Sequence, residues 1–173
     1  RRMATVGAGC TLKELTRALA AAGLQLYSII EIGNLTAGAM ACCHTKNRHV
    51  PGDFGILSSY VSGVTLVDSQ GRVHRITEES HSVDGVRADP SVYGTPAAML
   101  RHVRSSHGLL GVICEVVVRV KPMKGRAISH RRFANGAAFV RECASTFGRD
   151  ADGESIFAYF NPYTDRFLVE QTR

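Results

Sequence analysis

The sequence predicts a mixed α+β protein in which strands are often neighbours along the chain. A capping box at Thr11 and Glu14 opens a helix near the N-terminus, and two apolar runs around Ser69-Gln70-Gly71 indicate a β-hairpin. The β-branched run Val112–Val120 is the strongest strand signal. Strands and helices do not alternate regularly, so the pattern favours an α+β fold over a parallel α/β sheet.

The N-terminal third is predicted to contain a strand, a helix and a long loop. Met3–Ala8 is the strand, and Gly23 ends a helix whose apolar face consists of Leu12, Leu15, Leu19 and Ala22. Leu24–Ile32 is apolar and is expected to be extended. Residues 33–58 are rich in glycine and small polar residues and have no clean period, which predicts a long, functional loop.

The middle of the chain is predicted to form a hairpin, a helix and a strand. Val61–Asp68 and Arg72–Ile76 are the two arms of the hairpin. Residues 78–95 are polar and rich in turn residues, with Asp89-Pro90 and Gly94 among them. Pro96–Arg104 is predicted to be a helix with proline in its first turn.

Lys121–Gly125 contains proline and glycine and is predicted to be a domain boundary. Beyond it, Ala127–Phe133 is expected to be a strand, and a helix is expected to begin after Asn135 and to end at Gly148. A second hairpin is predicted from the two runs Ser155–Phe160 and Arg166–Gln171.

The composition is that of a folded chain with a basic surplus. Apolar residues make up 45%, and 21 Lys+Arg against 15 Asp+Glu give a net charge of +6. The basic residues are scattered, and the densest cluster is only His130-Arg131-Arg132, so we expect a solvated face and no nucleic-acid partner. The apolar runs are too short for a transmembrane helix, and we expect neither a membrane span nor a secretory signal.

The five cysteines, at positions 10, 42, 43, 114 and 143, fit no disulfide framework. Cys42 and Cys43 are adjacent, and His44 follows them. No Cys-x-x-Cys spacing occurs, so we predict no metal site. Unpaired cysteines indicate a reducing compartment, and we expect a cytoplasmic protein.

Two glycine-containing segments are candidates for ligand binding. Gly7-Ala8-Gly9 lies between a strand and a helix, as in the dinucleotide fingerprint, but Leu12 takes the place of the third glycine. We therefore do not predict a Rossmann site. The segment Gly33–Thr45 is more informative, because its small side chains let a ligand approach the backbone. Taken alone, it is also compatible with a packing loop, and His44 with a hydrogen-bonded structural histidine.

A resemblance emerges when five pieces of sequence are taken in order. They are Thr5–Leu12 with the helix that ends at Gly23, Ile32–Thr45, Phe54-Gly55, Val64–Val67 with Gly71-Arg72-Val73, and Ser106–Glu115. This ordered set resembles the FAD-binding domain of the vanillyl-alcohol oxidase superfamily, also called PCMH-type flavoproteins. Within it, the sequence is most similar to the aldonolactone and alditol oxidase branch. It departs from that branch at Cys42–Thr45, which replaces a Thr-Gly-Thr-His-Gly run.

The resemblance implies that the cofactor is FAD. It assigns the pyrophosphate and isoalloxazine to backbone groups around Thr36–Thr45, and the adenine or ribose side to the segment that begins at Gly111. It also places Phe54-Gly55 beside the flavin loop. The cofactor-binding residues so implied are Thr36, Ala37, Gly38, Ala39, Cys42, Cys43, His44, Thr45, Gly55, Gly111, Val112 and Ile113.

The resemblance also implies two domains. Residues 1–122 would form the PCMH-type FAD-binding domain, a mixed sheet flanked by helices, without the first βαβ piece that family members carry. Residues 126–173 would begin an α+β substrate-binding cap. Since most of the cap is expected to lie beyond this sequence, no residue is assigned a catalytic role.

The first functional hypothesis is therefore an FAD-linked oxidase or dehydrogenase that acts on a CH–OH group of a small polyol, sugar lactone or related substrate. The second is an NADPH-dependent flavin reductase of the UDP-sugar type. The third is a non-catalytic nucleotide-binding module. The expected partner is a small-molecule substrate, and the sequence carries no signal for an oligomeric state.

Overall fold

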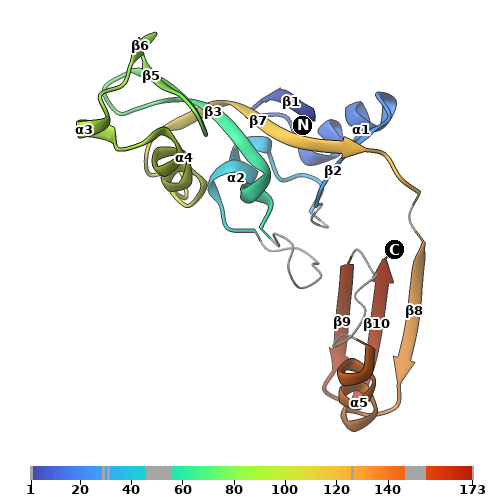
Figure 1. The fold of residues 1–173 in the computed structure, drawn as a ribbon. Coiled ribbons are helices and arrows are strands. Elements are labelled where there is room, and N and C mark those ends of the chain that lie inside the picture. Colours follow the sequence, from blue (N-terminus) through green and yellow to red (C-terminus); the bar gives the residue numbers. More distant parts are fainter. Residues whose placement is uncertain are drawn as a thin grey trace. The chain divides into compact units, whose positions relative to one another are not determined.

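The computed structural model describes residues 2–28, 30, 32–45, 56–125, 127–146 and 155–172. They form a mixed α+β protein, as predicted, that divides into two compact units between Met123 and Lys124 (Figure 1). The division falls inside the segment 121–125. Among the described residues, no helix has both the length and the apolar character needed to cross a membrane.

The first unit is built on a seven-stranded sheet whose paired strands are all antiparallel. The strand order is β1-β7-β3-β4-β5-β6, and β2 pairs with the C-terminal end of β7. The predicted hairpin is confirmed as β3 and β4, with Val67 opposite Val73. The strands are β1 (Arg2–Gly7), β2 (Leu24–Leu26), β3 (Val61–Val67), β4 (Val73–Thr77), β5 (His81–Val83), β6 (Val86–Arg87) and β7 (Val112–Pro122).

The helices of this unit begin where the sequence supplies a cap. The capping box before α1 (Leu12–Ala21) is confirmed, because the Glu14 amide donates to Thr11 Oγ1 at 3.2 Å and the Thr11 amide donates to Glu14 Oε2 at 2.8 Å. Gly23 follows the helix with a φ of +68°. The predicted helix Pro96–Arg104 is α4, which Thr95 caps. A single turn, α3 (Pro90–Tyr93), precedes it.

One face of the sheet forms the hydrophobic core with the helices. Val6, Val116, Val64 and Ile76 lie opposite one another in register across four strands. Against them pack apolar side chains of the helices, among them Leu12, Leu15, Leu19, Met40, Leu100 and Val103. Burial of one such side chain stabilises the fold by about 1.5–3 kcal/mol, so this layer is the main source of stability of the unit.

The prediction of a loop over residues 33–58 is wrong for two segments. Residues Ala37–Cys42 form helix α2, capped by Thr36, and Leu57–Tyr60 form a 3₁₀ helix, η1. Helix α2 has six residues, which are too few to display a helical period. Three of them are alanines, which suit a small-residue loop in the sequence but are also strong helix formers. Ala37, Met40 and Ala41 are buried in the core.

Two other segments contain short elements. Within the run 24–32, predicted to be extended, Leu24–Leu26 forms strand β2, where β7 offers a partner, and residues 29 and 31 lie outside the described residues. The polar, turn-rich residues 78–95 contain β5, β6 and α3. These short strands pair with β4 and with each other, so tertiary pairing and not local pattern creates them.

The second unit is a three-stranded sheet with one helix, α5 (Gly136–Thr146). Strands β8 (Ile128–Phe133), β9 (Ser155–Asn161) and β10 (Arg166–Thr172) run in the order β8-β10-β9, which confirms the predicted strand and second hairpin. Asn135 Oδ1 accepts from the Ala138 amide at 2.9 Å and caps α5 as expected. Gly148, the predicted end of that helix, lies outside the described residues.

A polar cluster sits at the edge of the core of the first unit. His74 and His81 are almost fully buried, and His74 Nδ1 lies 3.0 Å from His81 Nε2. His74 Nε2 lies 3.1 Å from Asp68 Oδ2, which also accepts from Arg72 Nε at 2.8 Å. Burial opposes ionisation of Asp68, but hydrogen bonds from Arg72, His74 and two backbone amides outweigh it and hold its pKa far below the ordinary value. The carboxylate is therefore ionised at neutral pH.

The buried His81 makes folding sensitive to mild acid. Burial first, and then the neighbouring His74, lower the pKa of His81. In the unfolded chain His81 takes up a proton near pH 6.5, whereas in the folded protein it does so only at a lower pH. The stability that this ring contributes is therefore present above about pH 6.5 and is lost as the pH falls through the pKa of the folded state. We expect the free energy of unfolding of the first unit, measured in urea, to drop between about pH 7.5 and pH 5.5.

The control for this prediction is His102, which is exposed on α4. The variant His102→Gln should keep the drop between the two pH values, whereas His81→Gln should show a smaller one. Asp68 does not interfere, because its lowered pKa affects stability only below about pH 4. An equal drop in both variants would contradict the assignment to His81.

Candidate functional site

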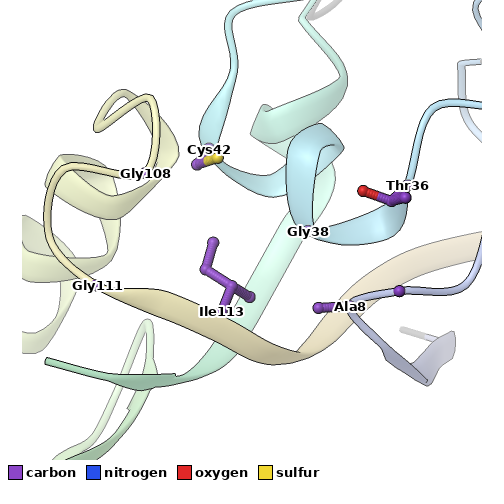
Figure 2. Close-up of a pocket in the computed structure, with 8 residues that line it drawn as sticks. Ala8, Thr36, Gly38, Cys42, Gly108, Gly111 and Ile113 are labelled. Atoms are coloured by element: carbon purple, nitrogen blue, oxygen red, sulfur yellow. The ribbon is translucent and has the colours of Figure 1, made fainter. Parts of the chain in front are cut away.

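A pocket of about 300 Å³ opens in the first unit where three segments distant in sequence converge (Figure 2). The segments are the turn between β1 and α1, helix α2 with its cap, and the loop that leads into β7. Ile113 projects from β7 towards α2 (Figure 2). The lining residues are Ala8, Gly9, Thr36, Gly38, Cys42, Gly108, Gly111 and Ile113.

Backbone hydrogen bonds hold the three segments together. The Gly38 amide donates to the Ala8 carbonyl at 2.9 Å, which joins the start of α2 to the turn after β1. At the other end of α2, the His107 amide donates to the Cys42 carbonyl at 3.0 Å, which attaches the loop before β7. The shape of the pocket therefore depends on the path of the backbone more than on any side chain.

Two of the lining glycines leave little room for a side chain. Gly111 has a φ of +145°, and a Cβ there would lie 2.3 Å from the Val67 carbonyl oxygen. A Cβ on Gly38 would lie 3.1 Å from Ala8 Cβ and 3.3 Å from its carbonyl oxygen. A side chain at Gly38 would therefore press against Ala8, while the glycine itself lines the pocket.

The other two lining glycines leave space in the pocket. A Cβ added to Gly9 or to Gly108 would meet no atom within 4 Å. Gly108 has a φ of +83°, so a side chain there would be strained, but Gly9 has no such restriction. Within the described part of the chain, the Gly9 amide has no hydrogen-bond acceptor. Gly9 therefore combines a backbone amide that is free to donate with open space in the pocket.

The lining is uncharged and largely apolar. Thr36 Oγ1 accepts from the Ala39 amide at 3.3 Å, so part of its hydrogen-bonding capacity is used by the cap of α2. Burial, and then the adjacent Cys43, raise the pKa of the Cys42 thiol, whose sulfur lies 4.0 Å from Cys43 Sγ. Cys42 is therefore a protonated, weakly reactive thiol at neutral pH.

The structure brings together some, but not all, of the residues that the sequence nominated. Five line the pocket: Thr36, Gly38, Cys42, Gly111 and Ile113. Six others do not: Ala37, Ala39, Cys43, His44, Thr45 and Val112. Ala37 is fully buried in the core, and Val112 is largely exposed. Gly55 lies outside the described residues.

His44 has a hydrogen-bonded partner away from the pocket lining. Its Nε2 lies 2.8 Å from Ser105 Oγ, at the end of α4. This agrees with the interpretation of a structural histidine and removes it from the pocket wall. The bond links the segment after α2 to the loop before β7, so His44 supports the pocket from outside.

Sequence reasoning missed three lining residues: Ala8, Gly9 and Gly108. A signal was present for the first two, because Gly7-Ala8-Gly9 stands between a strand and a helix. Leu12 breaks the complete dinucleotide fingerprint there, and the resemblance assigns no cofactor contact to these residues. In the structure Leu12 is a core residue, and Ala8 and Gly9 line the pocket.

Comparison of the sequence with models of known protein families and with curated proteins gives no match.

The packing role of Gly111 can be tested without any ligand. Gly111→Ala should lower the free energy of unfolding of the first unit by about 2–4 kcal/mol, because the added Cβ strikes the Val67 carbonyl and the backbone conformation disfavours a side chain. Gly7→Ala is the matched control. It adds a Cβ with no atom within 4 Å, and we expect a change within about 0.5 kcal/mol. Equal stability of the two variants in urea would show that β7 tolerates a side chain at Gly111.

Proposed function

We propose that the first unit binds FAD and is part of an FAD-dependent oxidoreductase that oxidises an alcohol carbon of a small polyol, sugar lactone or related substrate. One observation carries this proposal. The resemblance assigns two separate segments to the cofactor, Thr36–Thr45 and Gly111–Ile113, and members of both line the same pocket. A chance resemblance gives no reason for two segments so distant in sequence to converge on one site.

The pocket suits part of a dinucleotide. Its volume, about 300 Å³, lies at the lower end of the range for small-molecule sites, so it would hold one portion of FAD. Space beside Gly9 and Gly108 would admit a flat ring or a phosphate close to the backbone. Since no charged side chain is among the lining residues, backbone amides such as that of Gly9 would meet the phosphate oxygens.

Bound FAD would accept the hydride from the substrate carbon. The residues of this chain would bind and orient it. Ile113 would pack against a ring face, and the protonated thiol of Cys42 would contribute a small, neutral wall. The lining residues include no acid or base that would take the substrate proton, so the proposal gives this pocket a cofactor-holding role only.

We also propose that the second unit belongs to a substrate-binding cap. Its support is that residues 124–172, where described, form a compact unit of their own, with a three-stranded sheet and one helix. A fold of this kind agrees with the α+β cap that the resemblance implies for residues 126–173.

The FAD proposal is tested by a pair of glycine variants. Gly9→Val places a branched side chain in the open space of the pocket and should weaken FAD binding by at least about tenfold, because it blocks approach to the backbone. Gly7→Val adds the same side chain two residues earlier, away from the lining residues, and should leave binding unchanged. Quenching of flavin fluorescence on titration into the purified protein measures both affinities.

Circular dichroism and urea unfolding verify that both variants are folded. No FAD binding by the unchanged protein would refute the proposal, and so would equal affinities of the two folded variants. Reoxidation of the bound, reduced flavin in air then distinguishes an oxidase from a dehydrogenase.

The adjacent cysteines provide a second test. Cys42 lines the pocket and is 8% exposed, whereas Cys43 is half-buried and is not among the lining residues. Bound FAD should therefore slow the alkylation of Cys42 several-fold and leave Cys43 unchanged. Labelling at about pH 8.5, where part of the thiol ionises, followed by mass mapping measures both rates. Equal protection of both cysteines, or of neither, would place the cofactor elsewhere.

A further inference from the structure

A second pocket, of about 510 Å³, lies at the far edge of the same sheet, against β5, β6 and the Pro90–Pro96 segment. It shares no lining residue with the first pocket. Its polar lining residues are Glu79, Ser80, His81, Ser82 and Arg87. His81 is also the last residue of the row of hydrogen bonds Asp68–His74–His81, so the pocket and this row meet at one side chain.

The ionised carboxylate of Asp68 determines which ring nitrogens of His74 and His81 carry protons. Asp68 can only accept, so His74 donates to it from Nε2. In a neutral His74, Nδ1 is then the acceptor, and His81 must donate to it from Nε2. The remaining nitrogen, His81 Nδ1, is consequently an acceptor with a free lone pair.

This acceptor lacks a partner. His81 Nδ1 is buried and has no hydrogen bond within the described part of the chain, while the side chain as a whole is only 4% exposed. A buried polar atom without a partner costs about 1–3 kcal/mol, so such atoms call for an explanation. A donor on a bound ligand would supply the missing partner.

Tyr93 packs against the two histidine rings beside this pocket. Its ring lies edge-on against His74 and His81, with centroids 5.6 Å and 5.1 Å away. It belongs to the single turn α3, which contributes no buried residue to the core. Pro90, the first residue of this turn, lines the pocket together with His81.

The remaining lining residues indicate a neutral ligand with hydroxyl groups. Glu79 and Arg87 have opposite charges, and neither has an ion pair among the residues that the structure describes. Ser80 and Ser82 add two hydroxyls, although Ser80 Oγ already bonds to Thr77 Oγ1 at 2.9 Å. The pocket therefore contains hydrogen-bond acceptors and donors, one of them an anion and one a cation. This mixture suits hydroxyl groups on a ligand, because each hydroxyl group both donates and accepts a hydrogen bond.

We propose that this second pocket binds a small neutral polyhydroxy compound, a polyol or a sugar, one hydroxyl of which donates to His81 Nδ1. Arg87 and Glu79 would bind its other hydroxyls. The proposal stands apart from FAD binding, because it rests on a different pocket and on different residues.

The test uses the 173-residue chain, with D-sorbitol as the probe. The nitrogen resonances of the histidine rings, recorded by NMR at neutral pH, should show His81 protonated at Nε2 only. Sorbitol should shift the Nδ1 resonance of His81 in a saturable manner. Glycine betaine at the same concentration has no hydroxyl group and should produce no saturable shift.

Variants connect the response to the pocket. Arg87→Ala removes an exposed side chain and should weaken the affinity for sorbitol about threefold to tenfold, the usual worth of a hydrogen bond. Arg101→Ala removes an exposed arginine on α4 and should leave it unchanged. Because the readout is a resonance of the His81 ring, His81 is kept in both variants, and the comparison of Arg87→Ala with Arg101→Ala decides the matter.

Three results would overturn the proposal. The first is a proton on Nδ1 of His81 in the free protein. The second is a shift that grows linearly with sorbitol or equally with betaine. The third is a sorbitol affinity that Arg87→Ala and Arg101→Ala change to the same extent.

Discussion

Strand β7 is the constraint on which the rest of the first unit depends. It pairs with β1 along one edge and with β3 and β2 along the other, so it joins segments from both ends of the unit. Val116, Val118 and Val120 point from it into the core, where α1, α2 and α4 cover the sheet. Its entry is equally constrained, because Gly111 passes so close to Val67 that only glycine fits. The floor of the first pocket is therefore a consequence of strand pairing.

The two pockets of this sheet differ in physical character. The first is formed by backbone, and hydrogen bonds such as that from the Ala37 amide to the Cys10 carbonyl, 2.8 Å long, hold α2 in place beside it. The second pocket lies at the end of a row of core side chains, because its lining residue His81 is opposite Ile76 in register. The apolar row thus ends in the His81 ring, whose Nε2 lies 3.0 Å from His74 Nδ1. One site suits close approach to peptide groups, and the other suits directional hydrogen bonding.

Much of the fold could be predicted from the sequence where the signal is local. The capping box of α1, the helix that opens at Pro96 and both hairpins depend on residues a few positions apart, and the structure contains all of them. Helix α2 and strands β5 and β6 were not predicted. They are too short to show a period, and they exist because Met40 enters the core and because β4 offers a partner to His81–Val83.

The sequence by itself determined the mixed α+β class, the boundary near Lys121 and the small-residue segments that surround the first pocket. Only the tertiary structure decided which of those residues share a wall, because backbone hydrogen bonds such as that from Gly38 to Ala8 leave no pattern in the side chains. The same holds for the histidines. Nothing in the spacing of Asp68, His74 and His81 indicates a chain of hydrogen bonds. The antiparallel register of β4 and β5, next to the turn at Asp68, brings their side chains within bonding distance.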